Sequence, residues 1–356
     1  MFSKKNTLAL FFIILLATPS FAKELPSFYQ GIRPLGMGGA FTAIADDSNA
    51  IFYNPAGLSR LNTWSFELPL VAETSNSNVD IYDEVQDIDF DNTTETTDFI
   101  RRHLGETADF RLGFVPNFVK KNFGVALLAQ ARTSLRFDNA AFPETSVRAQ
   151  GTGSGHVALA HSFLDDTLSV GASVKYIQAA TLDETYTAQQ IAGSNFDQTI
   201  EDDFYDGSGF GVDLGAIYTL PFKLESTLGL SIINVGGVDL GDAGEIDQQV
   251  NIGVAAKHSF EKISWMHFVG GADLVDVFTQ AGTDDDYFKR VRLGFEVQMP
   301  VLTLRTGIYQ GYVSYGASIN LKIVKLEYAS YAEEVGAFAG DSADRRHVVQ
   351  LALGAW

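Results

Sequence analysis

Side chains able to do covalent or metal chemistry are few and scattered in this 356-residue sequence. Cysteine is absent, and the six histidines show no His-x-x-x-His spacing that would place two imidazoles on one metal ion. His156 and His161 are five residues apart, so on one strand they point to opposite faces. No Gly-x-Ser-x-Gly elbow occurs, although a serine and a histidine from separate strands stay open as a catalytic pair. We therefore expect no enzyme, no cofactor and no metal site.

A compact stretch near the N-terminus, "GMGGAFTAIADDSNAIFYNPAG", holds a cluster of glycines. Gly36, Gly38 and Gly39 resemble a phosphate-binding loop only superficially, because the spacing and the lysine of such a loop are missing. Glycine has no Cβ and lets one backbone approach another closely. The three glycines therefore predict close packing against another element.

The same stretch continues with an acidic pair and a proline turn. Asp46-Asp47, or the following serine, is expected to cap a helical turn over 48–52, with a bound cation as the alternative. The turn Asn54-Pro55-Ala56 then ends that helix, because the residue before proline disfavours helical backbone. Asn54 can hydrogen-bond strand backbone or a polar side chain, or it is part of a plain terminating turn.

The first 22 residues have the pattern of a secretory signal peptide. Lys4 and Lys5 precede an apolar run over 8–16, and Ser20–Ala22 forms a small-x-small cleavage site. The lack of cysteine excludes a lipoprotein anchor. A net charge of −19 argues against nucleic acid as a partner, because phosphates need basic side chains.

Beyond the signal peptide, apolar and polar residues alternate as in strands with two different faces. Every second residue from Leu168 to Tyr176 is apolar, and the residues between them include Ser169 and Lys175. No run of 18 apolar residues follows residue 22, which excludes a helical membrane protein. We expect an all-β protein, a 14-stranded antiparallel transmembrane β-barrel, with strands over 63–73, 107–118, 123–137, 146–163, 167–181, 205–220, 226–236, 246–260, 263–279, 287–299, 301–310, 312–321, 323–332 and 345–356.

Short and long connections alternate between these strands, except for a tight turn at Gly311. Short turns on one rim and long loops on the other are typical of outer-membrane barrels. The long loops are strongly acidic, and the chain ends in Trp356, a terminal aromatic of the kind such barrels use for assembly. We expect a monomer in the outer membrane of a Gram-negative bacterium, in contact with outer-membrane lipid and lipopolysaccharide.

A barrel of fourteen strands is too wide for its own side chains to fill. Residues 23–62 precede the first strand and do not alternate. We therefore expect three regions: a signal peptide over 1–22, an N-terminal hatch over 23–62 inside the lumen, and the barrel over 63–356. Inward-facing charges, such as Lys175, Arg292 and Glu296, are expected to pin the hatch or to orient a ligand headgroup.

The stretch "GMGGAFTAIADDSNAIFYNPAGLSRL" resembles the N-terminal segment of the FadL-type long-chain fatty acid transporters of the outer membrane. Its opening, "GIRPLGMGGAFTAIADD", is most similar to the related PorV type, which serves protein secretion. The resemblance implies a hatch on the substrate path, formed by residues that include Asn54, Pro55, Ala56, Gly36, Gly38, Gly39, Phe41 and Phe52. It also implies a hydrophobic small-molecule ligand, of fatty acid or hydrocarbon type, that passes by passive diffusion.

The FadL-type resemblance further implies a kinked strand that opens a sideways exit into the membrane. Pro116 lies within a predicted strand and removes a ladder donor, which predicts a bulge, an edge or a local break. Gly151, Gly153 and Gly155 are a second candidate kink, with close approach of the hatch as the alternative. The PorV resemblance implies a different function, a scaffold barrel that holds a secreted-protein partner and moves no solute.

Overall fold

The computed structural model describes residues 28–222, 224–260, 263–278, 286–336 and 338–355. The signal peptide expected over 1–22 and the terminal Trp356 lie outside these residues. Among the described residues, no helix is long and apolar enough to cross a membrane.

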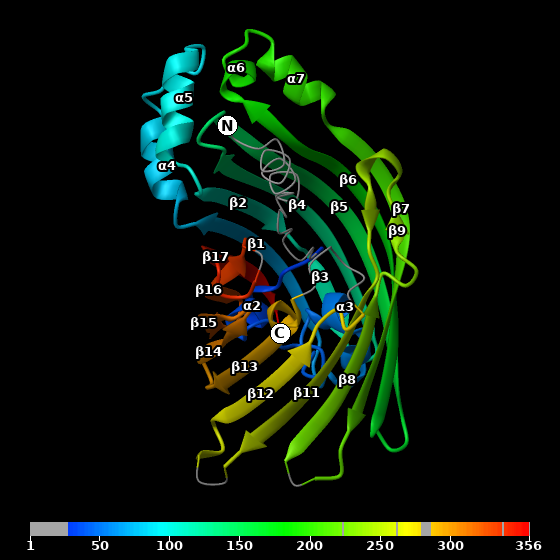
Figure 1. Cartoon of the computed structure of the whole chain (residues 1–356). Coiled ribbons are helices and arrows are strands. Elements are labelled where there is room, and N and C mark those ends of the chain that lie inside the picture. The colour runs from blue at the N-terminus through cyan, green and yellow to red at the C-terminus, as the bar shows by residue number, and fades with distance from the viewer. Residues whose placement is uncertain (1–27, 223, 261–262, 279–285, 337, 356) are drawn as a thin grey trace, which may run out of the picture.

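The described strands form one antiparallel sheet that closes on itself into a barrel, because the last strand pairs with the first (Figure 1). Strands β2 and β3 share one position in the order, so the barrel has fourteen strands in the described chain, as the alternation predicts. The barrel strands are β1 (Ser65–Ser75), β2 (Thr107–Phe114), β3 (Asn117–Lys120), β4 (Phe123–Asp138), β5 (Glu144–Phe163), β6 (Leu168–Thr187), β7 (Tyr205–Thr219), β8 (Glu225–Ile233), β11 (Gln249–Ser259), β12 (His267–Leu274), β13 (Val291–Gln298), β14 (Leu302–Tyr309), β15 (Tyr312–Leu321), β16 (Val324–Glu334) and β17 (Ala343–Ala355).

The strand alternation separates a lumen side from an outer side, as β6 shows. Ser169, Ser173 and Lys175 are buried on the inside, whereas Val174 and Tyr176 are exposed on the outside. Successive side chains of a strand point to opposite faces, so a polar set lines the lumen and an apolar set covers the outside.

The strands differ in length around the barrel. Strands β4 to β7 have 15 to 20 residues each and form what we call the tall wall. Strands β12 to β15 have 8 to 10 residues each and form the low wall. Four helices lie at the upper end of the tall-wall side (Figure 1): α4 (Asn78–Val85), α5 (Thr93–Arg102), α6 (Ala188–Ile191) and α7 (Phe196–Asp202).

Several strand ends differ from the prediction. Strand β6 continues to Thr187, into residues expected to form a loop. Strand β12 is shorter than expected, and β13 begins later than expected because Tyr287–Arg290 forms a 3-10 helix, η4, before it. Alternation alone does not distinguish the last residues of a strand from the start of an ordered loop.

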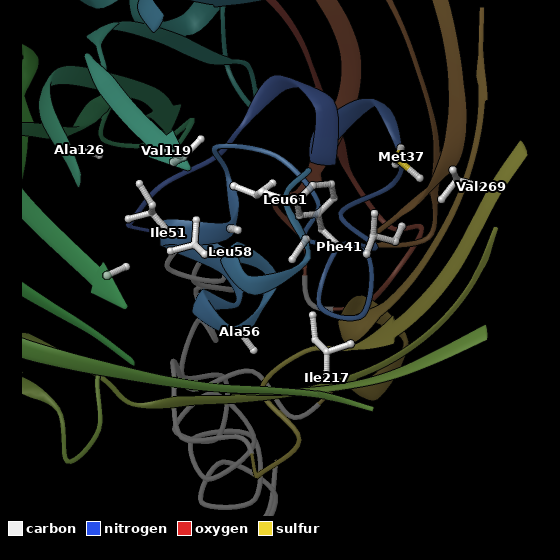
Figure 2. Close-up of a cluster of buried hydrophobic side chains, with 14 residues drawn as sticks. Met37, Phe41, Ile51, Ala56, Leu58, Leu61, Val119, Ala126, Ile217 and Val269 are labelled. Atoms are coloured by element: carbon white, nitrogen blue, oxygen red, sulfur yellow. The ribbon is translucent and has the colours of Figure 1, made fainter. Parts of the chain in front are cut away.

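Residues 28–62, which we call the N-terminal segment, lie inside the ring of strands (Figures 1 and 2). Its short helices are α2 (Ile32–Gly36), α3 (Ala50–Tyr53) and η1 (Pro55–Arg60). Its apolar residues form the largest buried cluster with inward-facing strand residues; labelled in Figure 2 are Met37, Phe41, Ile51, Ala56, Leu58 and Leu61 of the segment and Val119, Ala126, Ile217 and Val269 of the strands.

The acidic pair lies at the start of the turn that leads into helix α3. Asp47 accepts hydrogen bonds from the backbone and side-chain nitrogens of Asn49, at 2.8 and 2.9 Å, and its carbonyl oxygen accepts from the backbone nitrogen of Ala50 at 3.0 Å, so it caps this turn as predicted. Helix α3 itself begins after Asn49, whose side chain makes no cap hydrogen bond. Asp46 and Asp47 also contact Arg33, as described below.

Candidate functional site

Glycines of the barrel wall make room for the N-terminal segment. A Cβ on Gly294 of β13 would lie 3.0 Å from the Met37 side chain, and one on Gly316 of β15 would lie 3.2 Å from Cα of Gly36. A Cβ on Gly229 of β8 would lie only 2.6 Å from Cα of Ala43. Real Cβ atoms do not approach other atoms so closely, so these strand positions need glycine. The glycines that touch the segment are Gly124, Gly171, Gly215, Gly229, Gly253, Gly271, Gly294, Gly307 and Gly316.

The segment's own glycines take part in the same contacts. Gly38 and Gly39 have φ of +64° and +81°, a backbone conformation that disfavours any side chain. Gly38 packs on the backbone of β13 and β14, and Gly39 lies against Tyr309 and Arg292. Gly36, Gly38 and Gly39 therefore all contact the low wall.

Asn54 fixes the other side of the segment to β7 and β8. It is fully buried, and its Nδ2 donates to the carbonyl oxygens of Thr42 at 2.8 Å and of Leu230 at 3.2 Å. Its Oδ1 accepts from the backbone nitrogen of Ala56 at 3.2 Å and so caps η1. Pro55 and Ala56 follow directly and lie on Gly171 of β6. The turn thus joins two parts of the segment to the wall.

A buried ion-pair network fixes the segment to the low wall. The Arg33 guanidinium donates to both carboxylate oxygens of Glu296 of β13, at 2.8 and 2.9 Å. It also contacts Asp46 at 2.6 Å and Asp47 at 2.8 Å within the segment. Burial opposes its charge, but these carboxylates raise the pKa of Arg33 well above its usual value. The acidic pair therefore binds a guanidinium group in this structure.

A second wall carboxylate holds the segment's backbone. Asp273 of β12 accepts hydrogen bonds from the backbone nitrogens of Phe41 and Thr42, both at 2.7 Å. Phe41 is fully buried, and its ring meets Tyr53 edge to face at 5.4 Å and Arg33 at 5.2 Å. This part of the segment is thus anchored on the low-wall side.

A cavity of about 110 Å³ lies between the N-terminal segment and the wall. The segment contributes aromatic rings to it: Tyr29 stacks on Phe52 at 3.9 Å, and Tyr53 lies nearby with Tyr29 at 6.2 Å. Burial raises the pKa of Tyr53 to about 12, so its hydroxyl is neutral at physiological pH. Other lining residues are Phe28, Gln30, Leu35, Gly39, Thr42, His156, Lys175, Asp213, Ile233, Gln249, Asn251, Val275, Asp276, Arg292 and Tyr309.

The wall side of the cavity is charged. Lys175 of β6 donates to Asp213 of β7 at 2.7 Å, and both side chains are buried. The Arg292 guanidinium lies 3.7 Å from the centre of the Tyr309 ring. Among the described residues, Nη1 of Arg292 and Nδ1 of His156 have no hydrogen-bond partner. Buried polar atoms are usually satisfied, so these two atoms are available to water or to a polar group of a ligand.

A hairpin between β8 and β11 lies over the inner face of the tall wall (Figure 1). Its strands are β9 (Val238–Asp239) and β10 (Glu245–Ile246), and they precede and follow the 3-10 helix η2 (Gly241–Ala243). The glycines of β7 at 207, 209 and 211 lie directly beneath it, so the hairpin backbone rests flat on the strand. Val238 and Leu240 pack there with Phe28, which lines the cavity. The hairpin therefore closes this side of the lumen above the cavity.

The structure brings only some of the predicted site residues together. Gly39 and Phe52 line the cavity, whereas Gly36, Gly38, Phe41 and the turn Asn54-Pro55-Ala56 hold the segment against the wall. Sequence reasoning missed Asp213, the hairpin and the aromatic residues 28, 29 and 53. The alternation of side chains in β7 places Asp213 on the inward face, which could have identified it. The glycines at 207, 209 and 211 could have indicated that another backbone packs on β7.

Pro116 interrupts a strand as predicted, but it introduces no bulge. Strand β2 ends at Phe114 and β3 begins at Asn117. Both segments pair with β1 and with β4 in the same register. Val115 also donates to the Pro69 oxygen at 3.1 Å, so the ladder continues across the interruption. A sideways exit at Pro116 stays a prediction.

The second candidate kink is absent. Strand β5 pairs with β4 and with β6 without a change of register through Gly151, Gly153 and Gly155. The alternative, close approach of the hatch, is also wrong for these glycines. Nothing lies within 4 Å of a Cβ built on Gly151 or Gly153, and they face outward because their neighbours Thr152 and Ser154 are buried on the inside.

Comparison with known proteins places the fold. A family model described as "F plasmid transfer operon, TraF, protein" matches residues 144–261, which is less than half of the chain. No curated protein matches the sequence. A mutant of TodX, titled a monoaromatic hydrocarbon channel, aligns with a TM-score of 0.53 at 14% identity, over 91% of this chain and 97% of its own. The Ralstonia pickettii toluene transporter TbuX aligns with a TM-score of 0.52 at 12% identity, over 93% of this chain and 98% of its own. The chain thus has the same barrel fold as these two proteins.

Proposed function

We propose that this protein is an outer-membrane channel that passes small hydrophobic molecules by passive diffusion. It is exported with a cleaved signal peptide and acts as a monomer surrounded by outer-membrane lipid and lipopolysaccharide. The N-terminal segment is its hatch, which narrows the wide lumen of fourteen strands. The fold shared with two hydrocarbon channels supports this proposal. The comparisons give no support to the alternative, a PorV-like scaffold for secreted proteins.

The observation that carries the proposal is the cavity beside the hatch. Its volume, about 110 Å³, is of the order of the engineered apolar cavity of about 150 Å³ that binds benzene. Aromatic rings of the segment, such as Phe52 and Tyr53, offer the edge-to-face and stacked contacts that another ring prefers. A single-ring hydrocarbon therefore fits the cavity as it stands, whereas a long acyl chain requires the hatch or the hairpin to move.

The charged wall of the cavity is compatible with a neutral ligand. Lys175 and Asp213 neutralise each other, so a neutral ligand does not leave an isolated charge beside it. The ligand then leaves the cavity through the lumen or sideways into the membrane. A sideways path keeps an apolar molecule away from water, which is the physical reason to expect one.

Uptake of radiolabelled toluene by intact cells tests the proposal. Ile233 of β8 lines the cavity, and Ile233→Trp adds a ring that fills it. Leu230→Trp is the matched control, because Leu230 lies on the same strand and is exposed on the outside. We expect a loss of uptake of roughly tenfold or more for Ile233→Trp, equivalent to about 1.4 kcal/mol at the barrier, and none for the control. Equal uptake by both variants, at equal amounts of folded barrel, contradicts passage through this cavity.

A further inference from the structure

A shallow depression lies on the outer surface where β1 begins and β3 ends. It encloses about 640 Å³ and is lined by Asn62, Thr63, Trp64, Phe118, Lys120 and Lys121. None of these six residues is acidic, although the chain as a whole carries a net charge of −19. The depression is therefore a local basic site on a strongly acidic protein.

The lining residues point away from the lumen. Asn117 and Val119 of β3 are buried on the inside, so Phe118 and Lys120 face outward. The Phe118 ring lies 6.4 Å from the Trp64 ring and 6.5 Å from the Phe123 ring. The ammonium of Lys120 lies 5.8 Å from the centre of the Phe123 ring, a cation–π contact. Three rings and an ammonium group thus form one surface.

The turn that carries both lysines is fixed by the barrel and by the N-terminal segment. Lys120 pairs with Phe123 across the turn, and the backbone nitrogen of Asn122 donates to the Leu58 oxygen at 2.9 Å. Asn122 has φ of +69°, a conformation typical of a tight turn. The two ammonium groups therefore extend from a defined backbone, which favours binding of one compact anion.

An apolar outer surface continues up the wall from the depression. Phe66, Leu70 and Leu127 are exposed there, on the same outward face as Phe118. Aromatic rings and lysines at the end of an apolar face are the arrangement found where a membrane meets water. The neighbouring short turn at Asp165-Asp166 carries two acids, and the β15–β16 turn carries Lys322 alone. The lysine pair is thus specific to this edge of the barrel.

We propose that the depression binds the headgroup of an anionic phospholipid in the inner leaflet of the outer membrane. Lys120 and Lys121 contact its phosphate, Trp64 and Phe118 cover the glycerol region, and the acyl chains lie along β1 and β4. A lipid fits better than an acidic periplasmic protein, because the apolar surface above the lysines continues along the membrane-spanning wall. This inference rests on the membrane location in the proposed function.

Lipid retention by the purified full-length protein tests this site. The protein in mild detergent is mixed with equal amounts of phosphatidylglycerol and phosphatidylcholine of identical acyl chains, and the bound lipid is counted by native mass spectrometry. We expect the wild type to retain phosphatidylglycerol preferentially. The double variant Lys120→Gln/Lys121→Gln should lose roughly twenty-five-fold in that preference, since each lysine near an anionic surface contributes about fivefold. Lys322→Gln, which removes one lysine at another turn of the same rim, is the control and should keep the preference.

Three outcomes overturn the proposal. The wild type retains both lipids equally, or Lys322→Gln loses as much preference as the double variant, or a photo-crosslinker beside Lys120 captures a periplasmic protein in cells instead of lipid. Heat-modifiable migration on gels confirms in each case that the variant is a folded barrel. A protein that needs no detergent contradicts the membrane location itself, so failure of the proposed function is distinguishable from failure of this site.

Discussion

The tall wall and the low wall hold the same N-terminal segment by different chemistry. On the low-wall side the contacts are ionic: Arg33 pairs with Glu296, and Asp273 accepts two backbone hydrogen bonds. On the tall-wall side they are neutral: Asn54 donates to the Ala216 oxygen of β7 at 3.4 Å, and η1 packs on Gly171 of β6. The cavity is lined from both sides, by Lys175 and Asp213 of the tall wall and by Arg292 and Tyr309 of the low wall. The difference indicates that the low wall holds the N-terminal segment through charged side chains and the tall wall holds it through neutral contacts.

The largest effect is expected from a deletion that removes both attachments at once. Deletion of residues 23–60 removes the buried segment, and we expect a nearly closed barrel to become an open pore, because side chains alone do not fill fourteen strands. Single-channel conductance in planar bilayers measures the change. Unchanged conductance after deletion contradicts a role of this segment in closing the lumen.

A single glycine on the low wall is expected to have the next largest effect. Gly294→Val places a side chain against Met37, and overpacking of this kind costs about 1–3 kcal/mol, occasionally more. We expect a lower melting temperature and a higher conductance. Gly153→Val is the control, because nothing lies within 4 Å of a Cβ at that outward position. Similar effects of both substitutions would mean that glycine acts through the strand and not through the hatch.

The neutral attachment is tested by Asn54→Ala. The substitution leaves the Thr42 and Leu230 oxygens without this donor, at a cost of about 1–3 kcal/mol. The strands still pair, so we expect passage to change more than assembly. Toluene uptake and the amount of folded barrel are measured together. Normal uptake removes Asn54 from the mechanism, and loss of the barrel assigns it a structural role.

The smallest effect concerns the ionic attachment and pH. Burial favours the neutral acid, but the adjacent Arg33 lowers the pKa of Asp47 below its usual 3.8. A carboxyl group with a lowered pKa stabilises the folded state above its ordinary pKa, and this stability is lost as the pH falls through the folded value. Because Asp47 is about a quarter exposed, its contribution is about 1 kcal/mol or less.

We therefore expect the contribution of the Arg33–Asp47 contact to be constant from pH 7 to about 5 and to weaken below about pH 4. Conductance as a function of pH measures the attachment. Asp47→Asn should remove part of the acid dependence and should have little effect at pH 7 when Asp46 still pairs with Arg33. An increase in conductance between pH 7 and 5 would point to another titrating group.

The barrel was predictable because its signal repeats in every strand. Alternation such as that from Leu168 to Tyr176 recurs fourteen times, and closure requires the first and last strands to meet. The inward direction of Lys175 and Arg292 followed from the same parity. Because the pattern is repeated in every strand, errors of a few residues at each strand end do not change the prediction of a barrel.

The site was less predictable because it depends on contacts between distant residues. Nothing in the sequence places Arg33 beside Glu296, 263 residues away, and the contact of Arg33 with Asp46 and Asp47 was not predicted either. The strand glycines at 151, 153 and 155 looked like those at 171 or 294, yet they face the opposite side of the wall. Only the packed structure distinguishes a glycine that accommodates the hatch from one that faces outward.

The pairing of β1 with β17 sets the order in which this molecule can be assembled. Phe66 lies opposite Ala355, so the seam closes only when the C-terminal strand is in place. The N-terminal segment precedes that seam in the chain and lies within the finished ring, so the barrel must close around it. Successive strands can therefore pack their glycines against the segment while the barrel forms. A mutation that weakens the segment should slow the maturation of the barrel in the cell, even where the completed barrel is stable.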